Sequence, residues 1–170
     1  DRLQEVDLEQ RARLCAEAGA DAILVGTSLM LSSARNIALF QRLKEIVDVP
    51  IISFPGDVGQ VVPSADALLF LSMVSGRNPE LLIGQQVRAA PLLKEHGVEA
   101  IPTAYMLVES GTLTSLEFMS GTRPIPHGKN DIAMAHALAA QYLGMQMVYL
   151  ETGSGAGDSV PDAMLRAVSG

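Results

Sequence analysis

The chain has 170 residues, of which 48% are hydrophobic and 18% are charged, and its mean hydropathy is +0.26. This length and composition suit one globular α/β domain and exclude a disordered chain. With 12 basic and 19 acidic residues, a net charge of −7 and no cluster of Lys or Arg, the chain is not expected to bind nucleic acid.

The apolar segments are short, and the first ten residues are charged. The runs at 22–26 and 67–74 fall well below the roughly 18 to 20 residues that a membrane helix needs, and the start DRLQEVDLEQ is unlike a signal peptide. Cys15 is the single cysteine, so no disulfide can form within the chain, and its neighbours favour a small buried residue. These features predict a soluble, cytoplasmic protein.

Hydrophobic periodicity divides the chain into alternating helices and strands. The first helix is expected at 7–19, where apolar residues recur at helical spacing and Gly19 suits a helix end. A helix at 78–97 is expected to be interrupted by Pro91. The other helices are expected at 34–46 and 129–144. The strands are expected at 21–26, 50–56, 65–76, 98–111 and 145–151.

Five strands separated mostly by helices are typical of parallel β-α-β units, which form either a doubly wound sheet or a β/α barrel. The barrel is favoured because the unusual residues lie at or after strand ends, and in a barrel these ends form one shared mouth. A complete eight-unit barrel needs about 200 residues or more. We therefore expect one partial (β/α)8 TIM-type barrel domain over 1–170, lacking the first strand and the last two.

The segment 112–130 exceeds what a simple connection needs. Its residues Leu113, Ser115, Glu117 and Met119 alternate with others, which predicts an extra short strand and a loop. A functional loop over the mouth and a plain surface excursion both fit this pattern.

The helix at 129–144 is expected to bury one line of residues, and His136 on that line would be a packing histidine. His96 and His127 lie near a helix end and in a Pro/Gly loop, so they are expected to be exposed, and no histidine is given a catalytic role. The expected line consists of Ile132, His136, Ala139 and Leu143.

The stretch YLETGSGAG at 149–157 joins a carboxylate to a series of glycines. Tyr149 and Glu151 are two residues apart in a strand, so they share one face, and Leu150 points the other way. A glutamate at the end of an inward-facing row needs a partner, which makes Glu151 a candidate general base. An ion-paired structural glutamate is the alternative.

Three glycines in 153–157 allow positive φ angles and bring backbone N–H groups close to a ligand, and Ser154 adds a hydroxyl donor. Ser159 is expected to cap a following helix that has Pro161 in its first turn. Such a loop can hold a phosphate without lysines. A mere turn has the same composition, and the preceding Tyr-Leu-Glu is what favours the phosphate site.

Two hydroxyl residues, Thr27 and Ser28, directly follow a strand, where they can cap the next turn or touch a metal-bound diphosphate. The chain also has 8 methionines. They would suit the lining of a channel for a long hydrocarbon, although methionine more often fills a core.

Five segments, in order along the chain, resemble the family of geranylgeranylglyceryl phosphate synthase and heptaprenylglyceryl phosphate synthase. The middle segment is most similar to the second of the family's two groups, found in some archaea and certain bacteria. The segments are ILVGTS (23–28), PIISFPG (50–56), ADALLFLSMVSGRNP (65–79), IPTAYMLVESGTLTSLEFMSGTRPIP (101–126) and YLETGSGAG (149–157).

The resemblance implies a prenyltransferase of ether-lipid biosynthesis with a β/α-barrel fold. Such an enzyme joins sn-glycerol 1-phosphate to a polyprenyl diphosphate, here expected to be geranylgeranyl diphosphate, and releases diphosphate with Mg²⁺. Glu151 would accept the proton of the attacking glycerol hydroxyl. Thr152 stands where the family usually has alanine. The implied glycerol-phosphate-binding residues are Tyr149, Leu150, Glu151, Thr152, Gly153, Ser154 and Gly155.

The resemblance also implies a metal site in which an aspartate at the end of the first strand acts with a hydroxyl, a role that Thr27 or Ser28 can fill. The aspartate is expected in the missing strand, and Asp1 is not assigned to it. Tyr105 is a candidate for the wall of the prenyl channel. A homo-oligomer is expected, with no membrane span and at most transient membrane contact.

Two alternatives remain open at this point. One is a different phosphate-binding β/α-barrel enzyme, such as an isomerase that acts on a sugar phosphate. The other is a non-catalytic partial barrel that binds a polyol phosphate.

Overall fold

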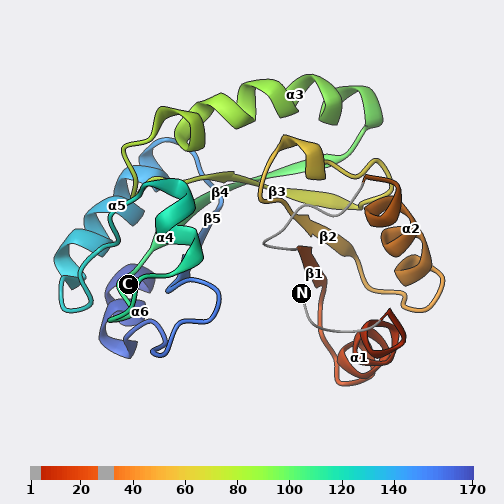
Figure 1. The fold of residues 1–170 in the computed structure, drawn as a ribbon, viewed down its shortest axis with the longest axis horizontal. Coiled ribbons are helices and arrows are strands. Elements are labelled where there is room, and N and C mark those ends of the chain that lie inside the picture. The colour runs from red at the N-terminus through yellow and green to blue at the C-terminus, as the bar shows by residue number, and fades with distance from the viewer. Residues whose placement is uncertain (1–4, 27–32) are drawn as a thin grey trace. The chain divides into compact units, whose positions relative to one another are not determined.

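The structure, a computed structural model, describes residues 5–26 and 33–170. Strands and helices alternate along this part of the chain (Figure 1). The strands are β1 (Ile23–Gly26), β2 (Ile51–Phe54), β3 (Ala67–Ser72), β4 (Glu99–Leu107) and β5 (Met147–Glu151). The helices are α1 (Glu5–Glu17), α2 (Ser33–Lys44), the 3-10 helix η1 (Val58–Gln60), the π-helix η2 (Glu80–Gly84), α3 (Gln85–His96), α4 (Ser115–Ser120), α5 (Asn130–Tyr142) and α6 (Asp162–Ser169).

The five described strands form a sheet in chain order, β1-β2-β3-β4-β5. The pairs β1–β2, β2–β3 and β4–β5 are parallel, with Ile23 opposite Ile51 and Ile52 opposite Ala67. Parallel neighbours need crossover connections, which are mostly helical in this chain. The α/β class and the five expected strands are therefore confirmed.

The chain divides into two compact units, and β3, α3 and β4 each contribute residues to both. The first unit comprises Asp1–Leu69 and Arg88–Ile101, and the second comprises Phe70–Val87 and Pro102–Gly170. The expected single domain over 1–170 stays a prediction.

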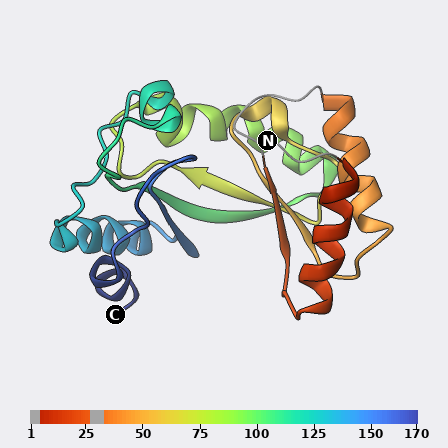
Figure 2. The same ribbon diagram turned by 60° about the horizontal axis from the view of Figure 1, so that its bottom comes forward.

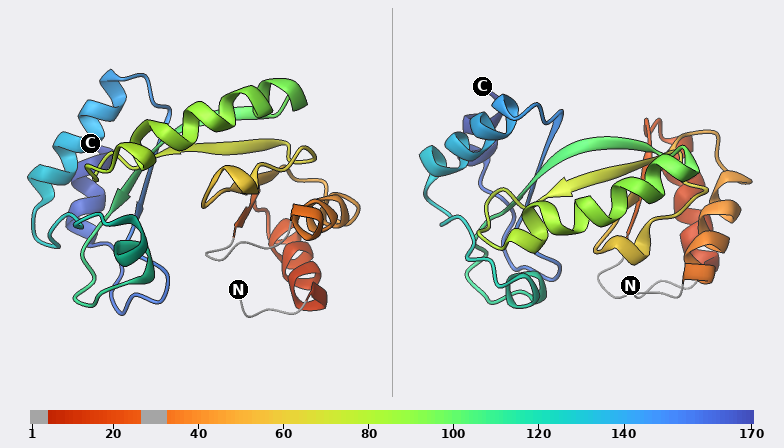
Figure 3. Two further views of the ribbon diagram at one scale, coloured as in Figure 1. Left: turned by 45° about the horizontal axis from the view of Figure 1, so that its top comes forward. Right: turned by 90° about the horizontal axis from the view of Figure 1, so that it is seen from above.

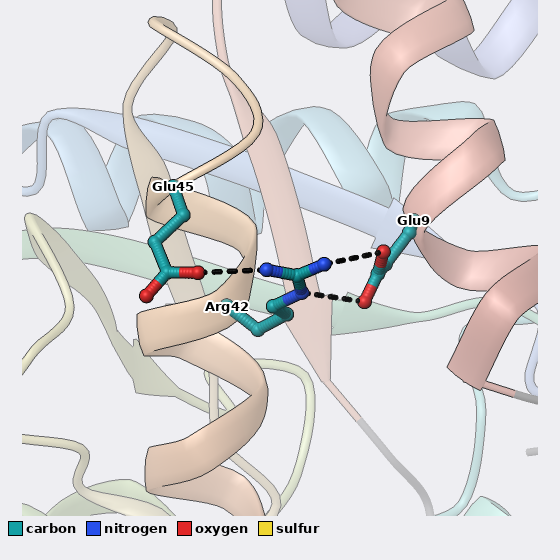
Figure 4. Close-up of polar contacts among 3 residues, drawn as sticks. All are labelled: Glu9, Arg42 and Glu45. Carbon is teal, nitrogen blue, oxygen red and sulfur yellow. Dashed lines mark hydrogen bonds and ion pairs between the residues drawn. The ribbon is translucent and has the colours of Figure 1, made fainter.

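In the first unit, α1 and α2 lie side by side (Figure 2). The Arg42 guanidinium bridges them, because its Nε lies 2.9 Å from Glu9 Oε1 and its Nη1 lies 2.8 Å from Glu45 Oε2 (Figure 4). The pairs are solvent-exposed, so they contribute little to stability. Cys15 of α1 is exposed, contrary to the expected burial, because α1 turns Ala12 rather than Cys15 into the core.

The start of β2 is held by a carboxylate. Asp66 Oδ2 accepts the Ile51 N–H at 2.8 Å, and its Oδ1 lies 2.6 Å from Lys44 Nζ at the end of α2. Burial raises the pKa of Asp66, but the hydrogen bonds from Lys44 and Ile51 outweigh burial and lower the pKa overall. This carboxylate joins α2, β2 and the turn before β3.

In the second unit, α5 and α6 pack against each other and cover one face of β5 (Figure 3). A buried cluster lies between these helices and the strand ends, and Val148 and Leu150 of β5 pack on it. The cluster consists of Met106, Val108, Ile125, Ala133, Ala137 and Met164.

The segment 115–120 is a helix, and the expected short strand is wrong. Thr114 caps α4 by accepting the Glu117 N–H on its hydroxyl at 3.3 Å, and Gly121, with φ 59°, ends the helix in the left-handed region. The two caps stabilise a helix by more than the short alternation of side chains favours a strand. After α4 the chain returns to the end of β4 through a bridge between Val108 and Ile125, in which the Ile125 N–H donates to the Leu107 carbonyl at 2.9 Å.

Pro91 lies inside α3 and does not interrupt it, contrary to expectation. A proline leaves the carbonyl four residues earlier, here that of Val87, without its helical donor. Pro91 and Val87 are both exposed, so water can bond that carbonyl and the helix continues.

The buried line of α5 also differs from the expected one, being made of Ala133, Ala137 and Ala140. Ile132 and Leu143 of the expected line are 37% and 75% exposed. The small alanine side chains let the helix approach its neighbours closely. This close packing stabilises the helix in this orientation by more than burial of Ile132 and Leu143 would in the expected one. His136 is half-buried, with its Nδ1 2.7 Å from the Ile132 carbonyl oxygen, while His96 and His127 are exposed as expected.

The last helix begins later than expected. Pro161 occupies the N-cap position with ψ 137°, and its carbonyl accepts the N–H groups of Met164 and Leu165 at 2.9 and 3.0 Å. Ser159 is therefore not the cap. None of the helices described is long and apolar enough to cross a membrane.

Candidate active site

The side chains at the end of β5 alternate between two environments. Val148 and Leu150 pack against the buried cluster beneath α5 and α6, so Tyr149 and Glu151 face the other side of the strand. Leu150 therefore points toward the helices. Glu151 is half-buried at the end of the strand, and its carbonyl accepts the Val108 N–H at 2.8 Å, which fixes its backbone.

Tyr105 of β4 joins Tyr149 and Glu151 on this face. The parallel register sets Tyr105 opposite Tyr149 and Leu107 opposite Glu151. The two tyrosine rings stack with centroids 5.8 Å apart and planes 7° from parallel, and Tyr105 is only 6% exposed. Its hydroxyl hydrogen-bonds the Glu151 carboxylate. The three side chains therefore form one cluster, called here the tyrosine-glutamate cluster.

The surroundings keep both phenols of the cluster protonated. Burial has the largest effect on the pKa of Tyr105 and raises it. The charge of Glu151, the hydrogen bond to Glu151 and the electrostatic effect of Tyr149 raise it further, so the pKa lies far above its ordinary value. Burial and the Glu151 charge also raise the pKa of Tyr149. A protonated Tyr105 donates to one Glu151 oxygen, and a carboxylate can accept further donors, so Glu151 keeps capacity for a ligand hydroxyl.

The segment after Glu151 turns sharply on glycine. Gly153 and Gly155 have φ 99° and 80°, in the left-handed region that side chains disfavour. The Ala156 N–H donates to the Gly153 carbonyl at 3.0 Å and closes a turn with Gly155 at its third position, where a positive φ is typical of a type II turn. Gly157 has no positive φ. Ser154 is exposed at the tip of this turn.

Of the predicted site residues, Tyr149 and Glu151 share one face of β5 and the turn at 153–156 follows them, whereas the Leu150 side chain packs on the opposite face. Tyr105, expected in a channel wall, lies in the cluster, and its channel role stays a prediction. Thr27 and Ser28 lie outside the described residues. Within 5–26 and 33–170, no group of three or more His, Cys, Asp or Glu side chains is close enough to hold a metal ion.

Sequence reasoning missed that Tyr105 is the partner of Glu151. A weak signal was present, because Tyr105 lies two residues before the end of β4, as Tyr149 lies two before the end of β5. Sequence reasoning also missed Thr114, whose side chain packs against Gly153. Its position before Glu117 is the signal for a helix cap, and nothing in the sequence indicates the contact with Gly153.

A model of the PcrB family matches residues 4–169, which is almost the whole chain. The chain belongs to this family. Curated relatives named geranylgeranylglyceryl phosphate synthase support the same assignment. That of Chitinophaga pinensis is 42% identical over 169 residues, and that of Spirosoma linguale is 44% identical over 168 residues. Each comparison covers 99% of this chain and 67% of the relative. The family expected from the sequence is thus confirmed.

Two solved structures of relatives superpose closely on this member of the PcrB family. One is (S)-3-O-geranylgeranylglyceryl phosphate synthase from Thermoplasma acidophilum in complex with sn-glycerol-1-phosphate, 33% identical, with a TM-score of 0.87. The other is wild-type GGGPS from Thermoplasma volcanium, 29% identical, with a TM-score of 0.91. These likenesses cover 94% and 98% of this chain but only 64% and 66% of the solved chains. They confirm the expected fold class, a partial β/α barrel of the TIM type.

Proposed function

We propose that this chain carries the glycerol-phosphate site of a prenyltransferase, which forms an ether between sn-glycerol 1-phosphate and geranylgeranyl diphosphate. The observation that carries the proposal is the tyrosine-glutamate cluster followed at once by the left-handed glycines Gly153 and Gly155. Membership of the PcrB family and the names of its relatives support the same reaction. The chain spans about two thirds of these relatives, so the proposal concerns the protein that carries it.

The two halves of the site have separate roles in the proposal. The turn at 153–156 offers backbone N–H groups, and Ser154 offers an exposed hydroxyl, to the phosphate of glycerol phosphate. The ring of Tyr149 and the carboxylate of Glu151 face the glycerol. Holding the phosphate at one fixed distance from Glu151 orients the attacking hydroxyl toward that carboxylate.

Glu151 accepts the proton in the bond-forming step. The glycerol oxygen attacks the allylic carbon that carries the diphosphate, a new C–O bond forms, and the bond to the diphosphate oxygen breaks. The proton released by the hydroxyl goes to the free oxygen of Glu151. Tyr105 contributes by holding the other oxygen through its hydroxyl, and it stays a donor because burial and the Glu151 charge raise its pKa.

Mg²⁺ belongs to the proposal as a partner of the diphosphate. Mg²⁺ is commonly bound by substrate phosphates with one or two protein oxygens, and it neutralises charge on the leaving diphosphate. Thr27 or Ser28 would supply a hydroxyl, together with a carboxylate from outside the described residues. No step is derived through the ion, because the described part of the chain contains no metal-ligand cluster.

The remaining parts of the proposal concern the prenyl channel, the oligomeric state and the cellular compartment. Tyr105 would border the end of the prenyl channel nearest the reacting carbon, because its ring stacks on Tyr149 beside Glu151. A homo-oligomer in the cytoplasm is also proposed.

The test uses the protein that carries this chain together with the flanking strands expected from the sequence. Labelled sn-glycerol 1-phosphate is incubated with geranylgeranyl diphosphate and Mg²⁺, and the organic phase is examined for a labelled ether. Product is expected only when all three are present. If no ether forms, the prenyltransferase proposal is abandoned, and turnover of a sugar phosphate in the same protein would favour an isomerase instead.

A further inference from the structure

Gly153, the first left-handed residue after Glu151, is in direct contact with Thr114. A Cβ atom placed on Gly153 would lie 2.5 Å from Oγ1, 2.7 Å from Cβ and 2.8 Å from Cγ2 of Thr114. Side-chain atoms do not approach one another so closely, so the Thr114 side chain occupies the space that the missing Cβ leaves. By contrast, nothing lies within 4 Å of a Cβ placed on Gly155 or Gly157. Of the three glycines in 153–157, only Gly153 is in contact with another segment at the place where a Cβ would lie.

Thr114 is itself held in one orientation. It is 6% exposed, although Leu113 before it is 70% exposed and Phe118 in the same short helix is 73% exposed. Its hydroxyl accepts the Glu117 N–H at 3.3 Å, and its carbonyl accepts the Phe118 N–H at 3.1 Å. The hydroxyl bond restrains χ1 of Thr114 and the carbonyl bond restrains its backbone, so the Cγ2 methyl has one position against Gly153. Figure 3 shows α4 beside the turn that follows β5.

The other end of α4 is anchored to the loop after β3. The Asn78 side chain donates to the Ser120 carbonyl at 3.1 Å and accepts the Glu80 N–H at 3.0 Å. Two residues after the helix, the Thr122 hydroxyl donates to Met73 Sδ at 3.0 Å, and Thr122 is 2% exposed. With its C-terminal end anchored in this way, α4 holds Thr114 against Gly153.

From this contact we infer that Thr114 is a positioning residue for the phosphate-binding turn, acting through Gly153 and not through the substrate. The inference rests on the proposed function, because the turn at 153–156 is taken to bind the phosphate of glycerol phosphate. The Cγ2 methyl of Thr114 sets how far the Gly153 backbone can move, and this fixes where the N–H groups that follow point. Removing that methyl loosens the turn and weakens phosphate binding, while Glu151, fixed by its own backbone bond to Val108, keeps its place.

Two substitutions separate the methyl from the hydroxyl. Thr114→Ser keeps the cap and removes the methyl, so the dissociation constant for sn-glycerol 1-phosphate should rise roughly fivefold, which corresponds to about 1 kcal/mol. The melting temperature should fall only slightly, by the small amount expected of one lost buried methyl group. Thr114→Val keeps the shape and removes the cap, so the melting temperature should fall while the dissociation constant stays within about twofold, since the contact with Gly153 is retained. Thr112→Ser, the same change at an exposed neighbouring threonine, is the matched control and should alter neither value.

The dissociation constant is measured by calorimetry with sn-glycerol 1-phosphate, and again with inorganic phosphate, on the protein that also carries the flanking strands. In turnover assays, Thr114→Ser should raise KM for glycerol phosphate and leave KM for the prenyl diphosphate and kcat unchanged. The inference is overturned if Thr114→Ser binds glycerol phosphate as tightly as wild type does, or if it raises KM for glycerol phosphate and for the prenyl diphosphate equally. It is also overturned if Thr114→Val weakens the binding of glycerol phosphate as much as Thr114→Ser does. If Thr114→Val does not fold, Thr114→Ser alone decides the question, because it keeps the cap.

The failure of this inference and that of the proposed function are distinguishable. A wild-type protein that binds glycerol phosphate without turnover, with weaker binding in Thr114→Ser, contradicts the prenyltransferase and supports the positioning role. Turnover with unchanged binding in Thr114→Ser contradicts the positioning role alone. A wild-type protein that binds neither sn-glycerol 1-phosphate nor inorganic phosphate contradicts both the prenyltransferase proposal and the positioning role of Thr114.

Discussion

At the scale of single residues, the site depends on a buried hydroxyl that supports a half-buried carboxylate. A carboxylate taken partly out of water is costly unless it accepts hydrogen bonds, and the Tyr105 hydroxyl supplies one to Glu151. The ring of Tyr149 stacks on that of Tyr105, which is only 6% exposed. The same contact that stabilises the carboxylate therefore makes ionisation of Tyr105 unfavourable.

Tyr105→Phe should change how stability depends on alkaline pH. The folded-state pKa of Tyr105 is raised above its unfolded value of about 10, so its contribution to stability is fully present below pH 10 and is lost as the pH rises further. Above pH 10, the wild type should lose up to about 1.4 kcal/mol per pH unit that the Phe variant does not lose. Urea unfolding at pH 8 to 11 measures the difference.

Tyr142→Phe is the control for that series, because Tyr142 is 79% exposed at the end of α5. Its variant should follow the wild-type curve at every pH. Parallel curves for wild type and Tyr105→Phe above pH 10 would show that burial and Glu151 do not hold Tyr105 in its neutral form.

At the scale of elements, the turn after β5 depends on glycine for its backbone. Gly155→Ala introduces a Cβ that touches nothing within 4 Å, so its whole effect comes from the φ of 80°. A left-handed residue other than glycine costs about 1 to 2 kcal/mol, and the free energy of unfolding should fall by that amount. Gly157→Ala, equally uncrowded and without a positive φ, should stay within about 0.5 kcal/mol of wild type. Chemical denaturation of the pair measures both, and equal effects would contradict the assigned turn.

The carboxylate that ties α2 to β2 should show its effect in acid. Asp66 has a lowered pKa, so its stabilising effect is present above the ordinary value of 3.8 and is lost as the pH falls through the folded-state pKa. Asp66→Asn should therefore be less stable than wild type at pH 7, by less than about 1 kcal/mol because the ion pair is partly exposed. The gap should close below pH 4.

Denaturant melts at pH 7, 5 and 3 measure that gap. Asp48→Asn, at an exposed position in the turn after α2, serves as the reference and should show no comparable gap. A gap between wild type and Asp66→Asn that persists unchanged at pH 3 would mean that the lost amide contact, and not the charge, accounts for it.

At the scale of the whole molecule, the sequence predicts the elements better than their contacts. Continuous apolar runs such as ALLFLS of β3 indicate buried parallel strands directly, because both faces of such a strand are covered. The contact of Tyr105 with Tyr149 depends on the register between β4 and β5, and a strand pairing distant in sequence leaves no local trace of that register. The chemistry of YLETGSGAG could thus be predicted, whereas the hydroxyl that supports it could not.

The segment around α4 is a second case in which the sequence does not predict a contact between distant residues. Its caps, Thr114 and Gly121, are readable from residue type, yet a short alternation of side chains points to a strand. The role of Thr114 against Gly153 involves two residues 39 positions apart in the chain. Only the folded second unit brings them into contact.

The most direct test of the account is the rate of ether formation by Glu151→Gln compared with wild type, at saturating sn-glycerol 1-phosphate and geranylgeranyl diphosphate. Because Gln keeps the shape of Glu151 but cannot accept the proton, the rate should fall by about 100-fold to 10,000-fold while glycerol phosphate still binds. Glu109→Gln, the same change at an exposed carboxylate that accepts the His127 N–H, should keep the wild-type rate. A Glu151→Gln protein that forms the ether within tenfold of the wild-type rate would contradict the role of Glu151 as the proton acceptor.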